Sequence, residues 1–516
     1  MTFKPESYKK GIALSTLYNV FNKGLVFCLS VLIAYFFGTQ LKVDIYFYAY
    51  NTIVIFSTFM TSLNASILIP ESMRLRSMEK EKEATIFLNF FLIVYFFIAF
   101  LICCLLIVDP TDFFSMISGF SKEALKDQKQ IILLSIPLLF LIPVTNFLAD
   151  ILTSYRFFTI PMIVGIINNL ISILFLVFLH NSLDVLSLLI GLLISNALNF
   201  ILLILLMKRK LNWQFRFQNP RMGKRIWKNI VFAQAGNITS SVCSYAPLYL
   251  LSGLQTGIIT SLTFAQQIAS LPTHLITNQF SSVVGIKFNE LYSKKEFATL
   301  NQIFISTSSF LFFILIPVSG IFFLFPDQIT SILLERGSFN KASVTYTASF
   351  LKWLGLLLPL IGINTLFARL FMASHKIKES FWYQILFNVS LILVLYITVP
   401  RFGFVAYPVT LVSIHLLNVL FCYFLERYYF NMIAYKLVLK KLFIVILLNI
   451  VIATLVYGLM HKIKIHSTIL TVVLGTGLYL MLFTIVGFKF NLDGTFNSFI
   501  GRFLERKANY GRIKNK

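Results

Sequence analysis

Long apolar runs are the feature that most constrains what this chain can fold into. A helix needs about 20 predominantly apolar residues to cross the hydrocarbon core of a bilayer. Only 12% of the 516 residues are charged, against about a quarter in soluble domains. We therefore expect an all-α, polytopic membrane protein with about 14 transmembrane helices. The runs lie at 14–36, 44–69, 86–108, 131–155, 161–179, 185–206, 228–251, 258–285, 302–325, 344–373, 380–399, 404–425, 438–460 and 467–488.

The basic residues fall mainly on one side of this arrangement. If the N-terminus and every second connection share a side, that side holds 32 of the 44 Lys and Arg residues, and the opposite side holds 9. Cytoplasmic loops of membrane proteins concentrate such residues, so both termini are expected in the cytoplasm. The net charge of +24 then indicates contact with anionic lipid. Nucleic acid is not an expected partner, because no soluble stretch is long enough for a reading module.

The connection 207–228 suggests how the spans are grouped. It carries eight basic residues and lies between the sixth and seventh spans. We expect a six-helix lobe at 1–210, a second six-helix lobe at 211–430, two further helices at 431–490 and a basic cytoplasmic tail at 491–516. Shifting the chain by 219 residues lays 149–169 on 368–388 and matches Asn169 with Asn388. Together with the number of spans and the basic connection at 207–228, this weak similarity predicts two pseudo-symmetric lobes.

Charged residues inside spans are functional candidates, because each costs about 2.5–3.5 kcal/mol to insert. Lys23 lies near the middle of the first span beside Asn22, and we expect both to face a water-filled cavity that binds substrate. Asp44 opens the second span, where it either lines the same cavity or simply lies at the interface. Charges near other span ends are predicted to serve coupling or gating, with snorkelling to the interface as the alternative. They are Asp150, Arg156, Lys352 and Arg369.

The seventh and eighth spans are too polar to face lipid. Their segments 232–245 and 263–282 include Asn237, Gln266, Gln267 and His274. These side chains predict a hydrated internal cavity lined by the second lobe. The alternative is hydrogen bonding between helices, which contributes about 0.6–2 kcal/mol per contact.

Motifs for ATP, zinc or acyl-transfer chemistry are missing from the sequence. It contains no GxxxxGK[ST], no HExxH, no GxSxG and no cluster of metal ligands. The longest outer loop, 109–130, is too short for a large extramembrane active site. We expect a transporter rather than an enzyme, with no cofactor, no metal and no use of ATP.

Several short motifs resemble the MviN/MurJ family of lipid-linked glycan flippases, within the multidrug/oligosaccharidyl-lipid/polysaccharide exporter superfamily. No single motif is specific, but their order and spacing across the spans are typical of the family. The matching residues are Phe37, Gly38 and Asp44; Arg156, Phe157, Pro161 and Asn168 or Asn169; Leu271 and Pro272; Arg336, Gly337 and Phe339; and Arg369, Phe371 and Lys378.

The resemblance implies two six-helix lobes around a central cavity, with a groove for a lipid tail formed by the last two spans. It also implies basic side chains in the cavity that hold a pyrophosphate, which pairs well with Arg and Lys. Lys23 aligns with one such arginine of the family. Ser57, Ser62 and Gln267 stand where the family has charged residues.

On these grounds we expect a flippase that moves an undecaprenyl-pyrophosphate-linked glycan, in the first place peptidoglycan lipid II, across the bacterial inner membrane by alternating access. Lys23 would bind the diphosphate, and Asn237, Gln266 and Gln267 would hydrogen-bond the sugars. Membrane potential or a Na⁺ or H⁺ gradient would drive transport. Membrane lipids and proteins of cell-wall or surface-polysaccharide synthesis are the expected partners.

Two alternatives have the same overall architecture. One is a flippase for O-antigen, capsule or exopolysaccharide units. The other is a drug/cation antiporter of the same superfamily, which needs a carboxylate that cycles with H⁺ or Na⁺. Asp150 is the one acid placed to serve it.

Overall fold

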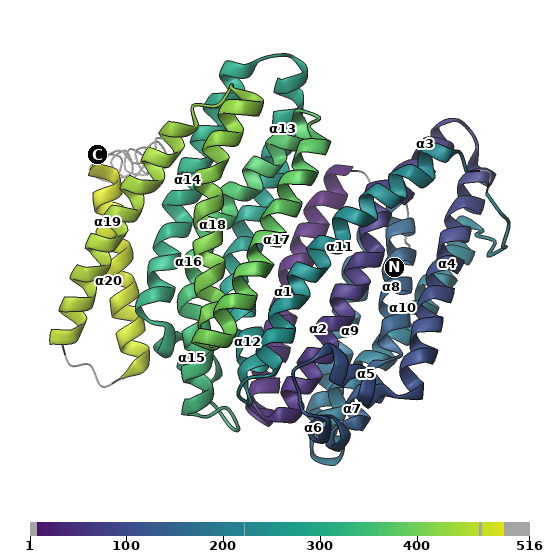
Figure 1. Ribbon diagram of the computed structural model, residues 1–516, viewed down its shortest axis with the longest axis horizontal. Coiled ribbons are helices and arrows are strands. Elements are labelled where there is room, and N and C mark those ends of the chain that lie inside the picture. Colours follow the sequence, from purple (N-terminus) through teal and green to yellow (C-terminus); the bar gives the residue numbers. More distant parts are fainter. Residues whose placement is uncertain (1–7, 221, 464–466, 490–516) are drawn as a thin grey trace, which may run out of the picture. The chain divides into compact units, whose positions relative to one another are not determined.

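The computed structural model describes residues 8–220, 222–463 and 467–489, and the predicted tail at 491–516 lies outside them. The described residues form helices and their connections (Figure 1). In the first half these are α1 (Tyr8–Phe37), α2 (Leu41–Leu63), a π-helical turn (Asn64–Leu68), α3 (Ile69–Ser77), α4 (Glu81–Val108), α5 (Pro110–Ile117), α6 (Lys122–Asp127), α7 (Lys129–Ser135), α8 (Leu138–Ser154), α9 (Ile160–Leu183), α10 (Leu186–Leu211) and α11 (Lys224–Ser252).

The second half continues in the same way. It comprises α12 (Ile258–Pro272), a π-helical turn (Thr273–Thr277), α13 (Asn278–Ser293), α14 (Phe297–Leu324), α15 (Pro326–Leu334), α16 (Lys341–Ala373), α17 (Ile377–Phe402), α18 (Ala406–Leu425), a π-helical turn (Glu426–Phe430), α19 (Tyr435–Lys462) and α20 (Thr468–Lys489).

Twelve of the described helical segments are long and apolar enough to cross a membrane. They correspond to twelve of the fourteen predicted spans. The other two predicted spans are α11 and the continuous helix from α12 to α13, which are long but more polar. The fold class is therefore confirmed, and the number of spans is approximate.

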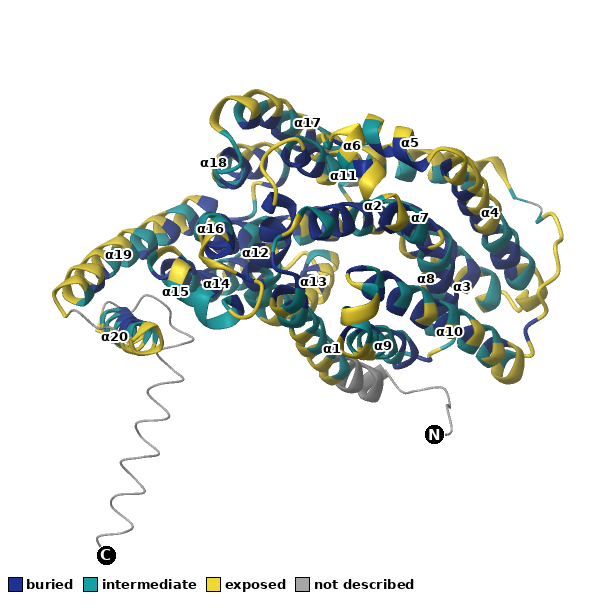
Figure 2. Cartoon of the chain, turned by 90° about the horizontal axis from the view of Figure 1, so that it is seen from below, coloured by how far each residue is buried: buried dark blue, intermediate teal, exposed yellow. Residues whose placement is uncertain are grey.

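Many exposed side chains on these helices are large and apolar, as a surface facing lipid requires. Phe97, Leu101 and Leu105 on α4 are each 60% or more exposed. Figure 2 shows exposed faces of this kind along α4, α19 and α20. A multi-pass membrane protein leaves such faces uncovered because acyl chains, and not water, surround them.

The chain divides into two compact units. Unit 1 comprises Met1–Ser261, Arg336–Ser343 and Asn388–Phe404, and unit 2 comprises Leu262–Glu335, Val344–Phe387 and Val405–Lys516. The chain passes between the units within α12, α16 and α17, and in the connections before α16 and after α17. The predicted lobes, 1–210 and 211–430, and the predicted pair of helices at 431–490 are defined by the repeat and not by contacts, so they stay a prediction.

A 219-residue spacing recurs in the backbone. Residues with positive φ are uncommon outside glycine because the side chain clashes with the main chain. Here four pairs of positive-φ residues are each 219 apart: Gly38 and Gly257, Arg156 and His375, Asp184 and Gly403, and Asn212 and Asn431. Connections at matching places in the two halves thus each contain a residue with positive φ.

Each unit has its own apolar core. In unit 1, α2, α4 and α8 pack together through buried side chains such as Phe87, Phe147 and Leu148. In unit 2, α14 packs on α19 and α20 around Phe312, Tyr479 and Phe483. These cores fix the helices from which the candidate functional side chains project.

Candidate substrate and gating residues

Lys23 is a half-buried cation in the span formed by α1. Among the residues that the structure describes, its ammonium group forms neither an ion pair nor a hydrogen bond. Next to it, Asn22 Oδ1 accepts a hydrogen bond of 2.8 Å from Asn169 Nδ2 on α9. The glycine at position 165 permits this contact, because a Cβ there would come within 2.8 Å of Asn22 Nδ2. The α1–α9 contact therefore fixes the turn of α1 from which Lys23 extends.

Asp44 is buried, with 1% of its surface exposed, and its carboxylate is held by the start of α12. Oδ2 accepts a hydrogen bond of 2.5 Å from Gly257 N, and Oδ1 accepts bonds of 2.8 and 2.6 Å from Thr260 N and Thr260 Oγ1. The first amides of a helix lack partners within it, and a carboxylate is well placed there. Asp44 thus ties the beginning of α2 to the beginning of α12 within unit 1.

The loop before α16 reinforces this end of unit 1. Ser338 N donates to Tyr35 O at 2.8 Å, and Ser338 Oγ donates to Phe36 O at 2.9 Å. Thr39 Oγ1 and Ser343 Oγ lie 2.7 Å apart. Gly38 adopts a φ of 60° where the backbone of Ser338 comes close, so a side chain would not fit. The motif residues Gly38, Asp44 and Gly337 therefore belong to one structural element.

Asn237 on α11 contacts α2. Its Nδ2 donates to Ser62 Oγ at 2.6 Å and to Gln234 Oε1 at 3.1 Å. Ser57, also on α2, is buried, and its Oγ accepts a 3.4 Å hydrogen bond from Asn146 Nδ2 on α8. Neutral polar pairs therefore occupy two of the three positions at which the resemblance placed charged residues.

Asp150 belongs to a polar cluster that the sequence did not reveal. Its Oδ2 accepts a 2.8 Å hydrogen bond from Asn64 Nδ2, and Asn64 Oδ1 accepts a 3.0 Å bond from Tyr95 Oη. Asn64 is fully buried and begins the π-helical turn after α2. Arg156 is exposed, with a φ of 67°, in the turn that follows α8. The predicted coupling acid is therefore joined to α2 and α4 by an amide and a phenol.

Gln266, Gln267 and His274 lie in unit 2, on α12 and the π-helical turn after Pro272. Gln266 is exposed, and Gln267 and His274 are half-buried. His274 Nδ1 lies 3.3 Å from Asn278 Nδ2.

Past the predicted span, Glu290 on α13 pairs with Lys287 and Lys294. The hydrogen bonds from Lys294 and then Lys287 lower the pKa of Glu290 to about 2.

The remaining predicted charges of unit 2 are packed against neighbouring helices. Lys352 Nζ lies 4.7 Å from the centre of the Phe323 ring, a cation–π contact. The stem of Arg369 crosses Gly285 on α13, where a Cβ would come within 3.0 Å of Arg369 Cδ. Glycine at 285 thus permits the close approach of α13 and α16.

Unit 2 contains one further polar pair, which was not among the residues predicted from the sequence. Asn364 Nδ2 on α16 lies 3.0 Å from His415 Nδ1 on α18, and the Phe387 ring packs on the imidazole at a centroid distance of 5.1 Å. Both polar residues interrupt apolar runs, at IGINTL and VSIHLL. That interruption is the signal by which the pair could have been found.

A protein-family model described as "Lipid II flippase MurJ" matches residues 33–474. A probable lipid II flippase MurJ of Borreliella burgdorferi is 23% identical over 363 residues, which is 69% of this chain and 71% of the relative. The corresponding protein of Aquifex aeolicus is 26% identical over 385 residues, which is 70% of this chain and 74% of the relative.

Solved structures agree on the fold. A lipid II flippase MurJ in an inward closed conformation gives a TM-score of 0.75 at 21% identity, covering 92% of this chain and 99% of that one. An inward-facing MATE-family multidrug transporter of the MOP superfamily gives 0.61 at 15% identity, covering 79% and 93%. Since the family model covers most of the chain, this multi-pass membrane protein belongs to the lipid II flippase MurJ family.

Proposed function

We propose that this protein flips lipid II, an undecaprenyl-pyrophosphate-linked glycan, across the bacterial inner membrane by alternating access. The match of residues 33–474 to the lipid II flippase family carries this proposal. The two relatives that share about 70% of the chain bear the same description. The twelve described helical segments that are long and apolar enough to cross a membrane suit transport of a lipid-linked cargo.

Lys23 is the residue to which we assign the pyrophosphate. It is a half-buried cation within a membrane span, and no carboxylate among the described residues neutralises it. An uncompensated charge in such a place is costly unless a ligand pairs with it. Phosphate oxygens accept charge-assisted hydrogen bonds from an ammonium group, and these are roughly twice as strong as neutral ones.

Neutral polar side chains supply hydrogen bonds for the sugars. Asn237, Gln266 and Gln267 carry amide groups that can donate to and accept from hydroxyl and acetamido groups. Asn237 already pairs with Ser62 and Gln234, so it can exchange a partner without losing all its bonds. Ser57, Ser62 and Gln267 are uncharged, so the protein has few charged side chains with which to bind its cargo. This favours a looser hold on the pyrophosphate and keeps a surface-polysaccharide unit as the second candidate cargo.

Alternating access requires a source of energy and a defined orientation. The distribution of basic residues supports cytoplasmic termini. Membrane potential supplies about 2.3 kcal/mol per charge per 100 mV, and Asp150, Lys352 and Arg369 are the charges we assign to coupling or gating. Enzymes of peptidoglycan synthesis are the partners that would supply and consume the cargo.

Complementation tests the proposal. A bacterial strain depleted of its own lipid II flippase would express this chain, and its lipid-linked precursors would be measured by mass spectrometry. We expect growth to be restored and the accumulated lipid II to fall to the level of the undepleted strain. Accumulation of lipid II despite full expression in the membrane would contradict the proposal. Restoration of a surface polymer in a strain lacking the corresponding flippase would support the second cargo instead.

A further inference from the structure

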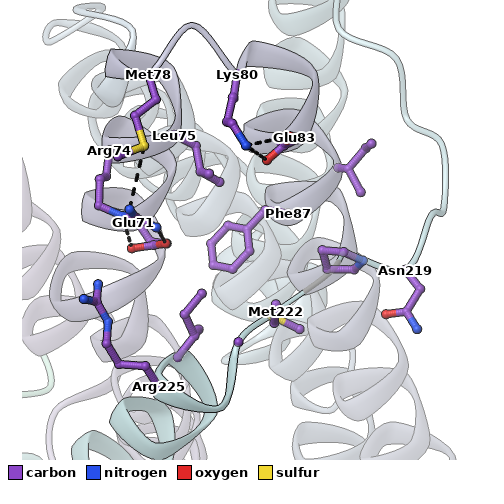
Figure 3. A pocket seen from close by; sticks show the side chains of 14 residues that line it. Glu71, Arg74, Leu75, Met78, Lys80, Glu83, Phe87, Asn219, Met222 and Arg225 are labelled. Carbon is purple, nitrogen blue, oxygen red and sulfur yellow. Dashed lines mark hydrogen bonds and ion pairs between the residues drawn. The ribbon is translucent and has the colours of Figure 1, made fainter.

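Unit 1 contains a pocket of about 780 Å³, and none of the residues assigned above to cargo binding, coupling or gating lines it. Three separate segments line it: α3, the start of α4, and the connection before α11 together with the first turn of α11 (Figure 3). α3 continues the second span, and α4 begins the third. The pocket therefore lies at the end of these spans that the basic residues assign to the cytoplasm.

Three cations and two carboxylates line the pocket. Arg74 donates to Glu71 from Nε at 2.9 Å and from Nη2 at 2.5 Å. Lys80 Nζ lies 3.2 Å from Glu83 Oε1. Arg225 on α11 lies within electrostatic range of Glu71, but its guanidinium group makes no hydrogen bond with any residue that the structure describes. One positive charge and its donors are thus left for a ligand.

Further positive charge adjoins Arg225. Lys224 and Lys228 are exposed on the same first turns of α11. A planar guanidinium group binds two phosphate oxygens at once, which makes Arg the preferred partner of this group. The excess of positive charge therefore favours an anionic ligand, and the guanidinium group of Arg225 has the geometry to bind a phosphate.

The floor of the pocket is apolar. Phe87 is 2% exposed, and Leu75, Ile86 and Ile226 are half-buried around it. Beside the pocket, Phe217 stacks on Phe90 at 6.1 Å and Trp227 is 46% exposed. Aromatic residues of this kind are typical of the membrane interface. A ligand that fills the pocket would have an apolar part next to its phosphate.

We propose that this pocket binds the phosphate group of an amphiphilic or small anionic ligand, with Arg225 as the donor. An anionic phospholipid head group and a soluble phosphate compound share this chemistry. The site is distinct from Lys23 and does not depend on the identity of the transported glycan.

Cross-linking in nanodiscs tests the proposal with the full chain. The probe is a photoactivatable phosphatidylglycerol, the matched probe is photoactivatable phosphatidylcholine, and the readout is the yield on peptides covering 71–87 and 219–226. A parallel arm measures the broadening of the ³¹P signal of inorganic phosphate. The test variant is Arg225→Gln, which removes an exposed side chain. Arg225→Lys keeps the charge without the planar pair of donors.

Unit 2 offers a matched control. Lys287→Gln with Lys294→Gln removes cations that are 46% and 57% exposed and pair with Glu290 on α13. We expect Arg225→Gln to lower the phosphatidylglycerol yield at least fivefold, with an intermediate yield for Arg225→Lys and none of this loss in the control. If Arg225→Gln abolishes the broadening of the phosphate signal, but the two lipid probes label the wild type equally, the site binds a soluble phosphate ligand instead of a lipid. If Arg225→Gln equals wild type in both arms, the proposal is overturned.

Discussion

The Asp44 carboxylate accepts two hydrogen bonds from Thr260, one from its hydroxyl at 2.6 Å and one from its backbone amide at 2.8 Å. The two residues are 216 positions apart. They join the start of α2 to the first turn of α12, one of the helices through which the chain passes between its compact units. The beginning of α12 is therefore fixed to unit 1 by a buried charge.

Replacing Asp44 with Asn should weaken this attachment. Gly257 N, Thr260 N and Thr260 Oγ1 all donate to the carboxylate, so the amide group of Asn would place a donor against a donor. Hydrogen bonds to charged groups contribute about 1.5–3 kcal/mol, which corresponds to about tenfold or more in an equilibrium. We expect at least a tenfold loss of lipid II flipping at unchanged expression, measured in proteoliposomes.

Asp184→Asn is the matched control for that variant. Asp184 is 52% exposed and pairs with Lys42 at the surface, where ion pairs contribute about 0–1 kcal/mol. Thr260→Val should cause a smaller loss than Asp44→Asn because the backbone donors stay, and Thr260→Ser should restore flipping. Wild-type flipping by Asp44→Asn would show that the attachment has no role in transport.

The Asn64 cluster should contribute to stability. In Asn64→Leu, the Asp150 carboxylate loses its donor, and an unsatisfied buried polar group costs about 1–3 kcal/mol. The Tyr95 hydroxyl loses Asn64 Oδ1 but can still donate to Met60 O at 2.6 Å. We expect a lower midpoint of thermal unfolding in detergent. The double variant Asn64→Leu with Asp150→Leu should lose less than the sum of the two single variants. Asn289→Leu, an exposed position on α13, serves as control, and an equal midpoint in Asn64→Leu would contradict the prediction.

Asn89 should hold the basic connection between α10 and α11, within 207–228, in place. Its Nδ2 donates to Gln214 O at 2.6 Å and to Arg216 O at 3.3 Å, and its Oδ1 accepts from Trp213 Nε1 at 2.8 Å. Each such bond contributes about 0.5–1.5 kcal/mol, so Asn89→Ala should raise the open population of the linker about tenfold. Limited trypsin digestion measures this as faster cleavage after Arg216. A cleavage rate equal to that of Asn219→Ala, a change on the linker without these contacts, would count against it.

The sequence predicted those features that depend on local pattern. Apolar runs located the helices, and the polarity of α11 and α12 explains why they differ from the other spans. The pairing of Asp44 with Thr260 and of Asp150 with Asn64 depends on which helices pack together, which no local pattern states. The internal repeat is likewise difficult to recognise from the sequence alone. Arg156 and His375, or Asp184 and Gly403, share a positive φ but not a side chain, so their correspondence is visible only in the backbone.

Lys23 provides the most direct test of the proposed transport function, because it is the cation assigned to the pyrophosphate of the cargo. The measurement is the rate of lipid II flipping by purified protein in proteoliposomes, compared at equal incorporation for wild type, Lys23→Ala and Lys23→Arg. Lys122→Ala controls for loss of charge, since Lys122 is 57% exposed on α6 and pairs with Asp112. We predict at least a tenfold lower rate for Lys23→Ala, because a charge-assisted bond of about 1.5–3 kcal/mol is lost, and retained flipping for Lys23→Arg. A wild-type rate for Lys23→Ala would contradict the account and place the pyrophosphate elsewhere.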